Sequence, residues 1–377
     1  MRENKFFPEM SGNFGFGCMR LPMKGDEVDF DEFNRMIDAF IDAGFNYFDT
    51  AHGYIGGKSE TAIRECLSKR YPREKFLLTN KLSDSYFNSQ EDIRPFLEKQ
   101  LELCGVDYFD CYLMHAQDKG NYGKYRQHKA YETAVKLKEE GLIRHVGLSF
   151  HDKAEVLDMI LTEHPEAEVV QIQFNYADFE DASVESRKVY EVCEKHQKPV
   201  IVMEPVKGGS LVNLPEEANG VFRSLGGGSN ASYAMRFAAG FPQMAMVISG
   251  MSNLEQMLDN IATMSDYKPL SFEEERAVNE VRRILGSINL IPCTSCKYCV
   301  EQNQCPMDIR IPDMFAALNS YETFHNWNTK YYYGAVITND GHGKAGDCIG
   351  CGGCESVCPQ HLQITDLLAK VSEVFDK

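Results

Sequence analysis

Eight of the 13 cysteines in this 377-residue chain stand in two tight groups near its end. Their spacings are Cys293-x2-Cys296-x2-Cys299-x5-Cys305-Pro and Cys348-x2-Cys351-x2-Cys354-x3-Cys358-Pro. Closely spaced thiolates followed by Cys-Pro suit a cubane iron-sulfur cluster, whose corners need four thiolates from one looped chain. Zinc held by four cysteines is the alternative, but two-residue intervals repeated in both groups favour iron and sulfide over zinc.

The residues after the two Cys-Pro pairs repeat one pattern. After Cys305 and after Cys358 come Pro, two apolar residues and an Asp at the same offsets, and each Asp leads into an amphipathic helical pattern. Two half-domains of one design are therefore predicted. The other cysteines are scattered, and we expect each to be a buried, unreactive thiol. These five are Cys18, Cys66, Cys104, Cys111 and Cys193.

A second set of chemically capable residues lies in the first third of the chain. Asp49 follows the apolar run 45–48, Tyr54 comes five residues later, and Lys81 and His115 follow two later runs. Each has an ordinary explanation by itself: an Asp that caps a helix, a Tyr or Lys at a rim, a His held by hydrogen bonds. Together they suit proton transfer, provided that the fold brings these strand ends to one place.

The elements that would position these residues can be read from the hydrophobic pattern. Short apolar runs alternate with longer helical patterns from residue 14 to about residue 250, which is typical of repeated βα units. Eight runs can be counted, at 14–18, 45–48, 76–79, 108–114, 144–148, 169–174, 199–203 and 244–248. Eight units close most economically into a (β/α)8 TIM barrel, whose strands end at a common mouth. A doubly wound open sheet is the competitor, but no Gly-x-Gly-x-x-Gly follows the first run.

Helical patterns complete the barrel region. The first, at residues 30–41, places Phe30, Phe33, Ile37, Phe40 and Ile41 on one face. Two more cover residues 253–264 and 271–284, and the last begins with a capping box, Ser271-Phe-Glu-Glu274. We therefore predict an α/β barrel over residues 1–286 and a smaller unit over residues 287–377.

Composition excludes several classes of partner. The chain is 43% hydrophobic and its formal net charge is −17, whereas nucleic acids and anionic membranes demand clustered Lys and Arg. No stretch approaches 18 uninterrupted apolar residues, and the first residues lack the apolar core of a signal peptide. We expect a cytoplasmic protein that binds neither nucleic acid nor membrane.

Residues 14–264 resemble the aldo-keto reductases. The motif Asp49-Thr-Ala-x-x-Tyr54, with Lys81 and His115 on the next two strands, matches that family's four catalytic positions. The resemblance implies hydride transfer between a nicotinamide cofactor, NAD(P)(H), and a small carbonyl or alcohol substrate. Tyr54 would donate or accept the proton, Lys81 would lower the pKa of Tyr54, Asp49 would hold Lys81, and His115 would orient the substrate oxygen.

The same resemblance assigns residues to the cofactor. They are Ser149, which ends the stretch Gly141-Leu-Ile-Arg-His-Val-Gly-Leu-Ser149, Gln171, Met203, Gly250, Gln256 and Asn260. Ser149 and Gln171 would bind the carboxamide, and Met203 stands where an aromatic residue commonly stacks on the ring. Gly250 and Gln256 stand where NADPH-preferring relatives use a lysine and an arginine to bind the 2'-phosphate. This departure leaves an NADH preference, or a different cofactor, open.

The cysteine-rich tail resembles the two-cluster ferredoxin domains, and its long spacer with helices after each Cys-Pro is similar to the mainly helical type. The resemblance implies two [4Fe-4S] clusters, with the fourth cysteine of each motif bound to the other cluster. One ligand set would be Cys293, Cys296, Cys299 and Cys358. The other set would be Cys348, Cys351, Cys354 and Cys305. The gap of five residues before Cys305 departs from the usual three.

The sequence leaves two hypotheses about how electrons reach the clusters. A hydride moves as an electron pair, whereas each cluster accepts one electron at a time. The first hypothesis is a nicotinamide-dependent oxidoreductase with a cluster-bearing tail and, for the clusters, a redox partner protein. The alternative is a ferredoxin-linked flavoenzyme, in which FMN binds the barrel and its phosphate meets Lys207-Gly208-Gly209-Ser210; a plain loop explains that stretch as well. A third class, a binding module without catalysis, predicts no turnover.

Overall fold

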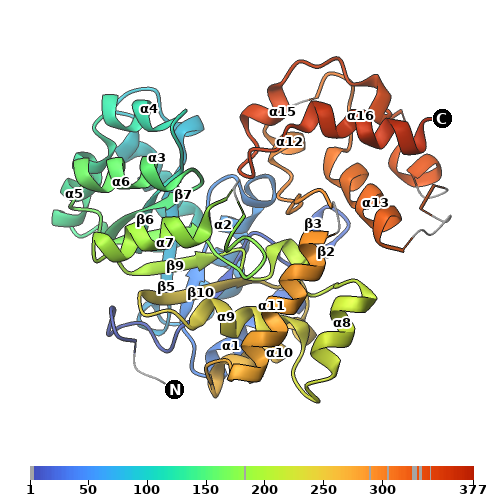
Figure 1. Cartoon of the computed structure of the whole chain (residues 1–377). Coiled ribbons are helices and arrows are strands. Elements are labelled where there is room, and N and C mark those ends of the chain that lie inside the picture. Colours follow the sequence, from blue (N-terminus) through green and yellow to red (C-terminus); the bar gives the residue numbers. More distant parts are fainter. Residues whose placement is uncertain are drawn as a thin grey trace. The chain divides into compact units, whose positions relative to one another are not determined.

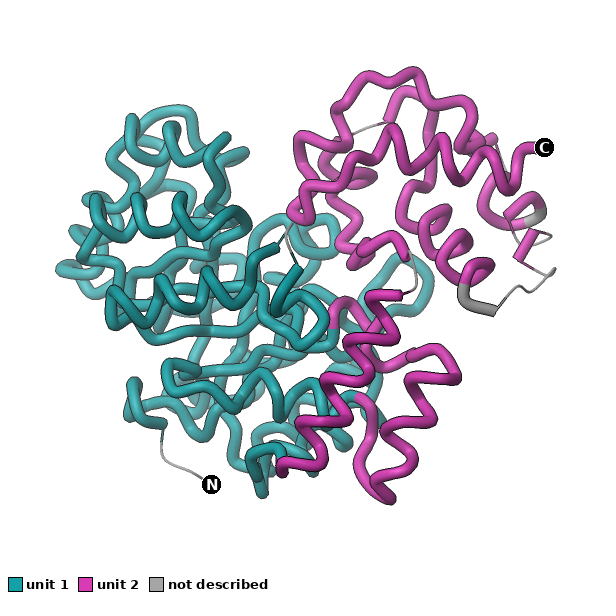
Figure 2. Tube along the Cα trace, in the orientation of Figure 1, with its two compact units in different colours: residues 1–206, 231–270 teal, residues 207–230, 271–377 magenta. Residues whose placement is uncertain are grey.

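The structure is a computed structural model that describes residues 4–181, 184–287, 290–303, 305–324, 329–330, 333–339 and 341–377. By its internal contacts the chain divides into two compact units, residues 1–206 with 231–270, and residues 207–230 with 271–377 (Figure 2). The boundary predicted between residues 286 and 287 falls inside the second unit, at the end of α11 (Phe272–Ser287).

The strands of the first unit close into a parallel barrel (Figure 1). Within the described residues, the order around the barrel is β1 (Phe14–Gly17), β10 (Met244–Gly250), β9 (Val200–Met203), β8 (Val169–Gln173), β7 (Ile143–Phe150), β6 (Phe109–Gln117), β5 (Leu77–Leu82) and β4 (Tyr47–Asp49). β1 pairs with both β10 and β4, so the sheet has no open edge. The predicted barrel is confirmed, with one strand in each of the eight apolar runs, and the open sheet is not formed.

Helices lie between the strands and cover the outside of the barrel. They are α1 (Phe30–Asp42), α2 (Lys58–Ile63), α3 (Ile93–Cys104), α4 (Tyr122–Gln127), α5 (Ala130–Glu139), α6 (Ala154–Glu163), α7 (Ser186–Lys195), α9 (Asn230–Ala239) and α10 (Leu254–Ser265). In α1, Phe33, Ile37 and Phe40 are buried as predicted, because they share one face at helical spacing. Phe30, the first residue of this helix, is 42% exposed, so its expected place on the buried face is wrong.

A small hairpin between β1 and α1 was not predicted. Its strands are β2 (Met23–Lys24) and β3 (Glu27–Val28), which pair antiparallel. Gly25 has a φ of 61° in the turn, a conformation that an L-residue adopts only with strain. Two strands of two residues each carry too little alternation for a sequence pattern to reveal them.

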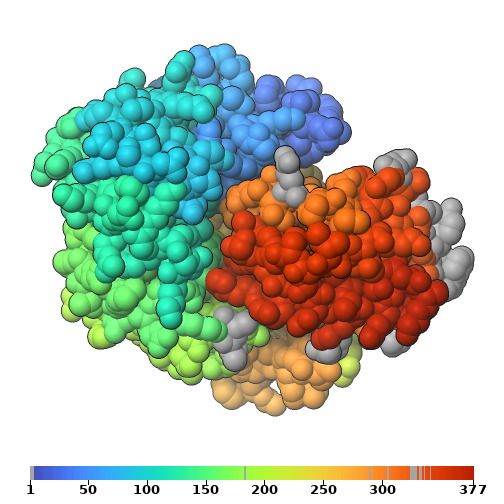
Figure 3. Space-filling model, turned by 90° about the horizontal axis from the view of Figure 1, so that it is seen from above, coloured from blue at the N-terminus to red at the C-terminus, as the bar shows by residue number. Residues whose placement is uncertain are grey.

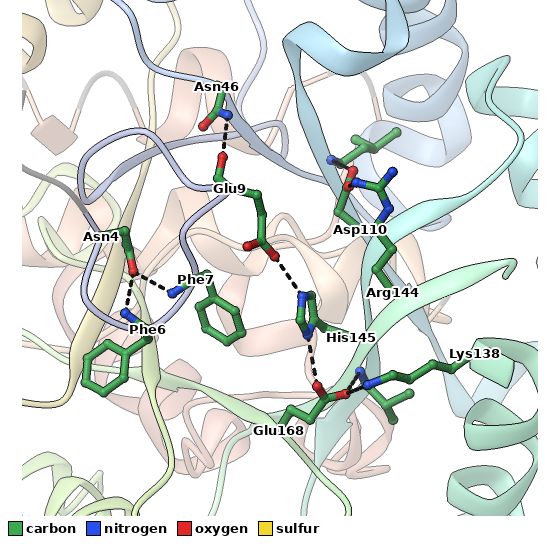
Figure 4. A network of polar contacts seen from close by, with 12 residues as sticks. Asn4, Phe6, Phe7, Glu9, Asn46, Asp110, Lys138, Arg144, His145 and Glu168 are labelled. Atoms are coloured by element: carbon green, nitrogen blue, oxygen red, sulfur yellow. Dashed lines mark hydrogen bonds and ion pairs between the residues drawn. The ribbon is translucent and has the colours of Figure 1, made fainter.

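The N-terminal segment closes the amino-terminal end of the barrel. Phe7 and Met10 are buried against side chains that point into the barrel, among them Leu113 and Met246. The Asn4 carboxamide oxygen accepts the backbone N–H groups of Phe6 and Phe7 (Figure 4). Its nitrogen donates to the carbonyls of Gly12 and of Ala245 in β10. The segment is therefore fixed by hydrogen bonds as well as by apolar contact.

The second unit is helical in its described residues. It contains α8 (Glu216–Arg223), α11, α12 (Tyr298–Glu301), α13 (Ile311–Phe324), α15 (Gly353–Ser356) and α16 (Ile364–Phe375). The predicted capping box of α11 is confirmed, since Ser271 N–H donates to Glu274 Oε2 at 2.7 Å and Glu274 N–H to Ser271 Oγ at 3.3 Å. Ile311, Met314, Phe315 and Leu368 are at the centre of the tail's core. The cysteine-rich tail is coloured orange to red in Figure 3.

Across the described parts of the chain, no helix is both long and apolar enough to cross a lipid bilayer.

An ion-pair network joins the N-terminal segment to β7 and α5 (Figure 4). His145 Nε2 lies 2.7 Å from Glu9 Oε1, and His145 Nδ1 lies 2.9 Å from Glu168 Oε2. Lys138 Nζ donates to Glu168 Oε1 at 2.6 Å. The hydrogen bond to Glu168 raises the pKa of His145 above its ordinary value. Burial opposes ionisation of Glu168, but the hydrogen bonds from His145 and Lys138 outweigh it and lower the Glu168 pKa to about 2.

We predict that His145→Gln destabilises the protein more at pH 6 than at pH 9. A histidine whose pKa rises on folding contributes its stability below the unfolded pKa of about 6.5 and loses it as the pH passes the folded pKa. We expect the free energy of unfolding to fall by about 1–2 kcal/mol near pH 6 and by less at pH 9. Calorimetry at both pH values gives the Tm and the enthalpy of unfolding from which this free energy is obtained. An equal loss at both pH values would mean that His145 acts only through packing, for example on Phe7.

Candidate active site and cysteine clusters

Three neighbouring strands carry the residues predicted to be catalytic. Asp49 is the last residue of β4, Lys81 is next to last in β5, and His115 lies near the end of β6. Tyr54 begins η1 (Tyr54–Gly57), the short helix after β4. Since these strands are adjacent in the barrel, the four side chains meet at its carboxyl end.

The Lys81 ammonium is the centre of this group. The side chain is fully buried, and Nζ donates to Asp49 Oδ1 at 2.6 Å, to the Thr50 carbonyl at 2.9 Å and to Tyr54 Oη at 3.1 Å. An ammonium has three hydrogens to donate, so these acceptors satisfy it. Asp49 is oriented in turn, because Gln171 Nε2 donates to its Oδ2 at 3.0 Å.

Tyr54 differs from expectation in one respect. Burial, followed by the nearby Asp49 carboxylate, holds the pKa of the Tyr54 phenol well above its ordinary value. The net lowering expected from Lys81 is therefore wrong for this structure, because burial of the phenol and the Asp49 carboxylate outweigh any lowering by the ammonium. Tyr54 remains a protonated phenol at neutral pH, with a cation in place to stabilise the tyrosinate once a proton has left.

His115 is held as a neutral imidazole. Burial, and then the positive charges of Lys81 and His151, keep its pKa well below the ordinary value. Its Nδ1 lies 2.5 Å from Ser83 Oγ, and its ring meets that of Tyr54 edge-on at a centroid distance of 6.1 Å. If the Ser83 hydroxyl donates to Nδ1, the proton of the ring is on Nε2 and can be donated to a bound oxygen.

Two residues of this site were missed from the sequence. Ser83 follows Lys81 by two positions, which is a weak signal because serine is common in loops. The Tyr125 hydroxyl of α4 shares its one hydrogen between the carbonyls of Leu82, at 2.8 Å, and His115, at 3.0 Å. Tyr125 thereby ties β5 to β6 beside the site, but no local motif marks it.

Ser149 and Gln171 are direct partners across β7 and β8. Ser149 Oγ accepts the Ala116 N–H at 2.7 Å, so its own hydroxyl hydrogen is available to donate. Gln171 uses its nitrogen on Asp49, which leaves the carboxamide oxygen to accept. This donor and acceptor pair matches what a nicotinamide carboxamide needs.

The remaining residues predicted to bind the cofactor lie at the ends of β9 and β10 and in α10. Met203 is the last residue of β9 and is partly buried. Asn260 is buried in α10, where its Nδ2 donates to Ser249 Oγ at 2.9 Å. Gly250 ends β10, and a Cβ there would lie 3.3–3.4 Å from the aliphatic carbons of Arg20, a residue missed from the sequence. The guanidinium of Arg20 lies 3.8 Å from Glu204 Oε1.

Gln256 belongs to the first turn of α10 and is engaged within that turn. Its Oε1 accepts the Ser252 N–H at 2.8 Å, and its own N–H donates to Asn253 Oδ1 at 2.9 Å. The Leu254 N–H donates to Glu32 Oε1 at 2.8 Å. At the start of α10, the Leu254 and Gln256 N–H groups therefore already have side-chain acceptors, the Glu32 carboxylate and Asn253.

The eight clustered cysteines line two cavities in the second unit. The first cavity is bordered by Cys293, Cys296, Cys299 and Cys358. The second is bordered by Cys305, Cys348, Cys351 and Cys354. Each cavity thus gathers three thiols of one motif and the fourth of the other. Ile311 lies between them and lines both.

The two cysteine motifs share one backbone conformation. Ser295 and Gly350 have positive φ at the second position after the first cysteine, and Lys297 and Gly352 have it at the fourth. The backbone also repeats after Cys305 and after Cys358. The third residue after each cysteine has a positive φ, and the sixth begins a helix, α13 or α16. The five residues between Cys299 and Cys305, against three between Cys354 and Cys358, therefore do not change the repeated positions of positive φ before and after this segment.

Backbone N–H groups face the sulfur of Cys358. Burial raises the pKa of this thiol, but the backbone N–H groups of Leu362, Gln360 and His361 act in the opposite direction. Ser295 N–H similarly donates to Cys293 Sγ at 3.4 Å. Backbone N–H groups aimed at sulfur are typical of cluster-bound cysteines, and each cavity presents four thiols among mainly apolar walls.

The glycine-rich stretch Lys207 to Ser210 has a packing role in the second unit. Gly208 has a φ of 61°, and a Cβ there would lie 2.4 Å from the carbonyl oxygen of Thr294, beside Cys293. Only glycine allows this close approach to the cysteine loop. The close approach explains the glycine without a phosphate ligand.

The scattered cysteines are all buried, as predicted. They are Cys18, Cys66, Cys104, Cys111 and Cys193. Burial raises the pKa of Cys18, Cys111 and Cys193, which keeps these thiols protonated and unreactive.

The fold and the site define a (β/α)8 barrel with buried polar chemistry at the carboxyl ends of its strands, joined to a cysteine-rich tail. Residues 13–283 match the sequence profile of the Aldo/keto reductase family, and residues 292–362 match that of a 4Fe-4S dicluster domain. The chain belongs to the aldo/keto reductase family and is an oxidoreductase of that type, with a 4Fe-4S ferredoxin-like domain.

Individual relatives are distant. The uncharacterized oxidoreductase YqkF of Bacillus subtilis is 25% identical over 296 residues, covering 70% of this chain and 90% of that protein. The NADH-specific methylglyoxal reductase of Escherichia coli is 29% identical over 197 residues, covering 46% and 57%. The solved aldo-keto reductase of Klebsiella pneumoniae in complex with NADPH has a TM-score of 0.58 at 20% identity, covering 72% and 90%. The last likeness is one of fold.

We predict that Ser83→Ala lowers kcat/KM for carbonyl reduction about 10-fold, because the His115 ring loses the partner that fixes its tautomer and orientation. Nicotinamide binding, measured by fluorescence titration, should not change. Ser83→Thr keeps a hydroxyl and is the matched control, with activity near that of the native protein. Native activity in Ser83→Ala would show that Ser83 does not orient His115.

Proposed function

We propose that the barrel transfers hydride between NAD(P)(H) and a small carbonyl or alcohol, with Tyr54 as proton donor and acceptor. The observation that carries this proposal is the chain of contacts from Asp49 through Lys81 Nζ to Tyr54 Oη, buried at the mouth of the barrel. An Asp and a Lys that merely formed a structural ion pair would not need a phenol on the same ammonium.

The proton path follows from the contacts. In reduction, Tyr54 Oη gives its proton to the substrate oxygen, which becomes the hydroxyl of the alcohol. The tyrosinate that remains accepts a hydrogen bond from Lys81 Nζ, so that one ammonium faces two anions, the tyrosinate and Asp49. His115, neutral and donating through Nε2, orients the same substrate oxygen. In alcohol oxidation Tyr54 is the base.

The cofactor assignments rest on the polar groups of the strand ends. We assign Ser149 and Gln171 to the carboxamide, Met203 to the ring, and Gly250, Gln256 and Asn260 to the nucleotide end. When bound, the nicotinamide supplies or accepts the hydride. NADH is the preferred form in this proposal, because Glu32 already accepts a hydrogen bond at the start of α10, where a further anionic phosphate would be repelled. The NADH-specific Escherichia coli relative is in keeping with this preference.

We propose that the tail holds two [4Fe-4S] clusters, each with three cysteines of one motif and the fourth of the other. The gathering of four thiols at each cavity supports both the cluster type and the exchange of the fourth ligand. We place the domain boundary between residues 286 and 287, in the gap between the two matched profiles.

A redox partner protein would reach the second cysteine set first. Cys351 is exposed and Ile349 is 63% exposed, whereas every cysteine of the first set is buried or only partly exposed. A one-electron carrier is the chemical class that a cubane cluster at a surface serves. We expect the protein to work in the cytoplasm, without nucleic acid or membrane partners.

We predict that Tyr54→Phe lowers kcat for carbonyl reduction at least about 100-fold, while binding of NADH, followed by fluorescence, stays within about twofold of native. The phenyl ring keeps the packing and removes only the proton donor. Tyr47→Phe removes another buried hydroxyl, which accepts the Thr79 hydroxyl at 2.6 Å, and is the control. Full activity in Tyr54→Phe would overturn the assignment of the proton donor and favour a binding module.

Double cysteine variants test the exchange of ligands. Cys351→Ser should remove about half of the iron and sulfide. Adding Cys305→Ser should remove little more, because both residues serve one cavity, whereas adding Cys358→Ser should remove nearly all. Iron and acid-labile sulfide are measured on anaerobic protein. Reversed results for the two doubles would show that each motif keeps its own fourth cysteine, and zinc in place of iron would contradict the cluster assignment.

The visible spectrum of the same anaerobic protein decides between the two electron-transfer hypotheses. Cluster absorbance together with NADH binding and no flavin band supports the proposed function. A stoichiometric flavin would support the alternative in which FMN occupies the barrel, for which the packing of Gly208 offers no support.

A further inference from the structure

Glu60 is a fully buried carboxylate that the proposed chemistry does not use. It lies in α2 and has 0% exposure. Its Oε2 lies 2.5 Å from His52 Nδ1, and its Oε1 accepts from Asn80 Nδ2 at 2.8 Å. Burying an ionised carboxylate is costly unless both oxygens are paired, as they are here. Such a group therefore has a fixed geometry, which it imposes on its partners.

The two partners belong to the two segments that carry Tyr54 and Lys81. His52 stands two residues before Tyr54 in the loop after β4, and Asn80 directly precedes Lys81 in β5. One side chain thus holds both segments, one with each oxygen. The His52 ring is also fixed edge-on by Tyr86, at a centroid distance of 4.7 Å, and by Phe96, at 5.2 Å.

On the strand side the network reaches the backbone of Lys81 itself. Asn80 Oδ1 accepts the Lys81 N–H at 2.8 Å and also Gln100 Nε2 at 3.0 Å. Gln100 Nε2 further donates to the Lys81 carbonyl at 3.1 Å, and Tyr112 OH donates to Gln100 Oε1 at 2.6 Å. The Lys81 N–H is therefore bound by Asn80, which Glu60 holds, and the Lys81 carbonyl by Gln100, which Asn80 holds in turn.

On the loop side the backbone needs such support. Ile55, directly after Tyr54, has a φ of 55°, and Gly56 and Gly57 also have positive φ. A β-branched residue in this region is strained by about 1–2 kcal/mol and persists only where other contacts fix it. The neighbour of Glu60 in α2 contributes as well, since Ser59 Oγ lies 2.8 Å from Thr50 Oγ1.

We propose that Glu60 is a positioning residue that sets the distance between Tyr54 Oη and Lys81 Nζ, through His52 on one side and Asn80 on the other. The inference rests on the proposed function, in which this pair moves the proton. Glu60 itself touches neither of the two groups, so its effect is on their alignment. A shift of about 1 Å in such a pair is enough to lower a rate about 100-fold.

The test compares Glu60→Ala with Glu60→Gln in the full-length, cluster-loaded protein. Alanine removes both links, whereas glutamine can still accept from Asn80 with its oxygen and donate to His52 with its nitrogen. We expect kcat to fall about 100-fold in Glu60→Ala with KM and NADH affinity within about threefold of native, and to recover to within about 10-fold in Glu60→Gln. The control is Asp110→Asn, a carboxylate equally buried at the opposite end of β6 and paired with Arg73 and Arg144, which should keep native kcat.

A second readout does not depend on turnover. The ionisation of Tyr54 is followed by ultraviolet difference titration, with Tyr54→Phe subtracted in both the native and the Glu60→Ala background. Loss of the aligned ammonium should move this ionisation to higher pH in Glu60→Ala and leave it unchanged in Asp110→Asn. If Tyr54→Phe is fully active while the ionisation still moves, the proton-donor assignment fails and the positioning role stands.

Native kcat together with native ionisation of Tyr54 in folded Glu60→Ala would overturn the proposal, as would an equal loss of kcat in Asp110→Asn. Should Glu60→Ala not fold, His52→Leu removes one of the two links and is measured in the same way. His52→Leu with native kcat and native ionisation would equally contradict the proposal.

Discussion

A buried ammonium sets the requirements that the active end of the barrel has to meet. Removing the charge of Lys81 from water is costly, and the cost is offset only because Nζ finds a carboxylate, a carbonyl and a phenol within 3.1 Å. These acceptors come from β4 and the loop after it, so β4 and β5 must be neighbours in register. The pairing of Asp49 with Thr79, two residues before Lys81, provides that register. The same contacts that satisfy the charge also align a proton donor, which links stability of the site to its chemistry.

The cysteine tail depends on a different constraint. Small helical units with a limited apolar core commonly need a metal or a disulfide to be stable. Here the described core residues, such as Ile311 and Leu368, surround the cavities that the thiols border. Because each cavity draws its fourth thiol from the other motif, the two half-domains cannot be separated without breaking both sites. The repeated positive φ positions show how two sequence motifs of different spacing reach one geometry.

Tertiary contacts give several residues an environment that the sequence did not predict. Tyr54 was expected to have a lowered pKa beside Lys81, yet burial, and then the Asp49 carboxylate, raise it. Gly250 was seen only as the loss of a basic side chain, but its missing Cβ gives room to the stem of Arg20. Gln256 is engaged within its own helical turn. In each case the decisive neighbour lies far away in the sequence or depends on a backbone conformation that composition does not reveal.

The sequence by itself determined the barrel, the family and the dicluster tail, because these depend on local periodicity and on short spacings of distinctive residues. Repeated βα patterns predict which strands are adjacent, and therefore that Asp49, Lys81 and His115 meet. Only the tertiary structure decided which side chains surround those groups. Ser83 contacts His115, and Tyr125 donates to the carbonyl of Leu82. Glu60 contacts both His52 and Asn80. The physical reason is that hydrogen bonds between side chains depend on packing to within fractions of an ångström. A pattern of residue types fixes which elements form, but not the rotamers and charges that their side chains adopt when packed.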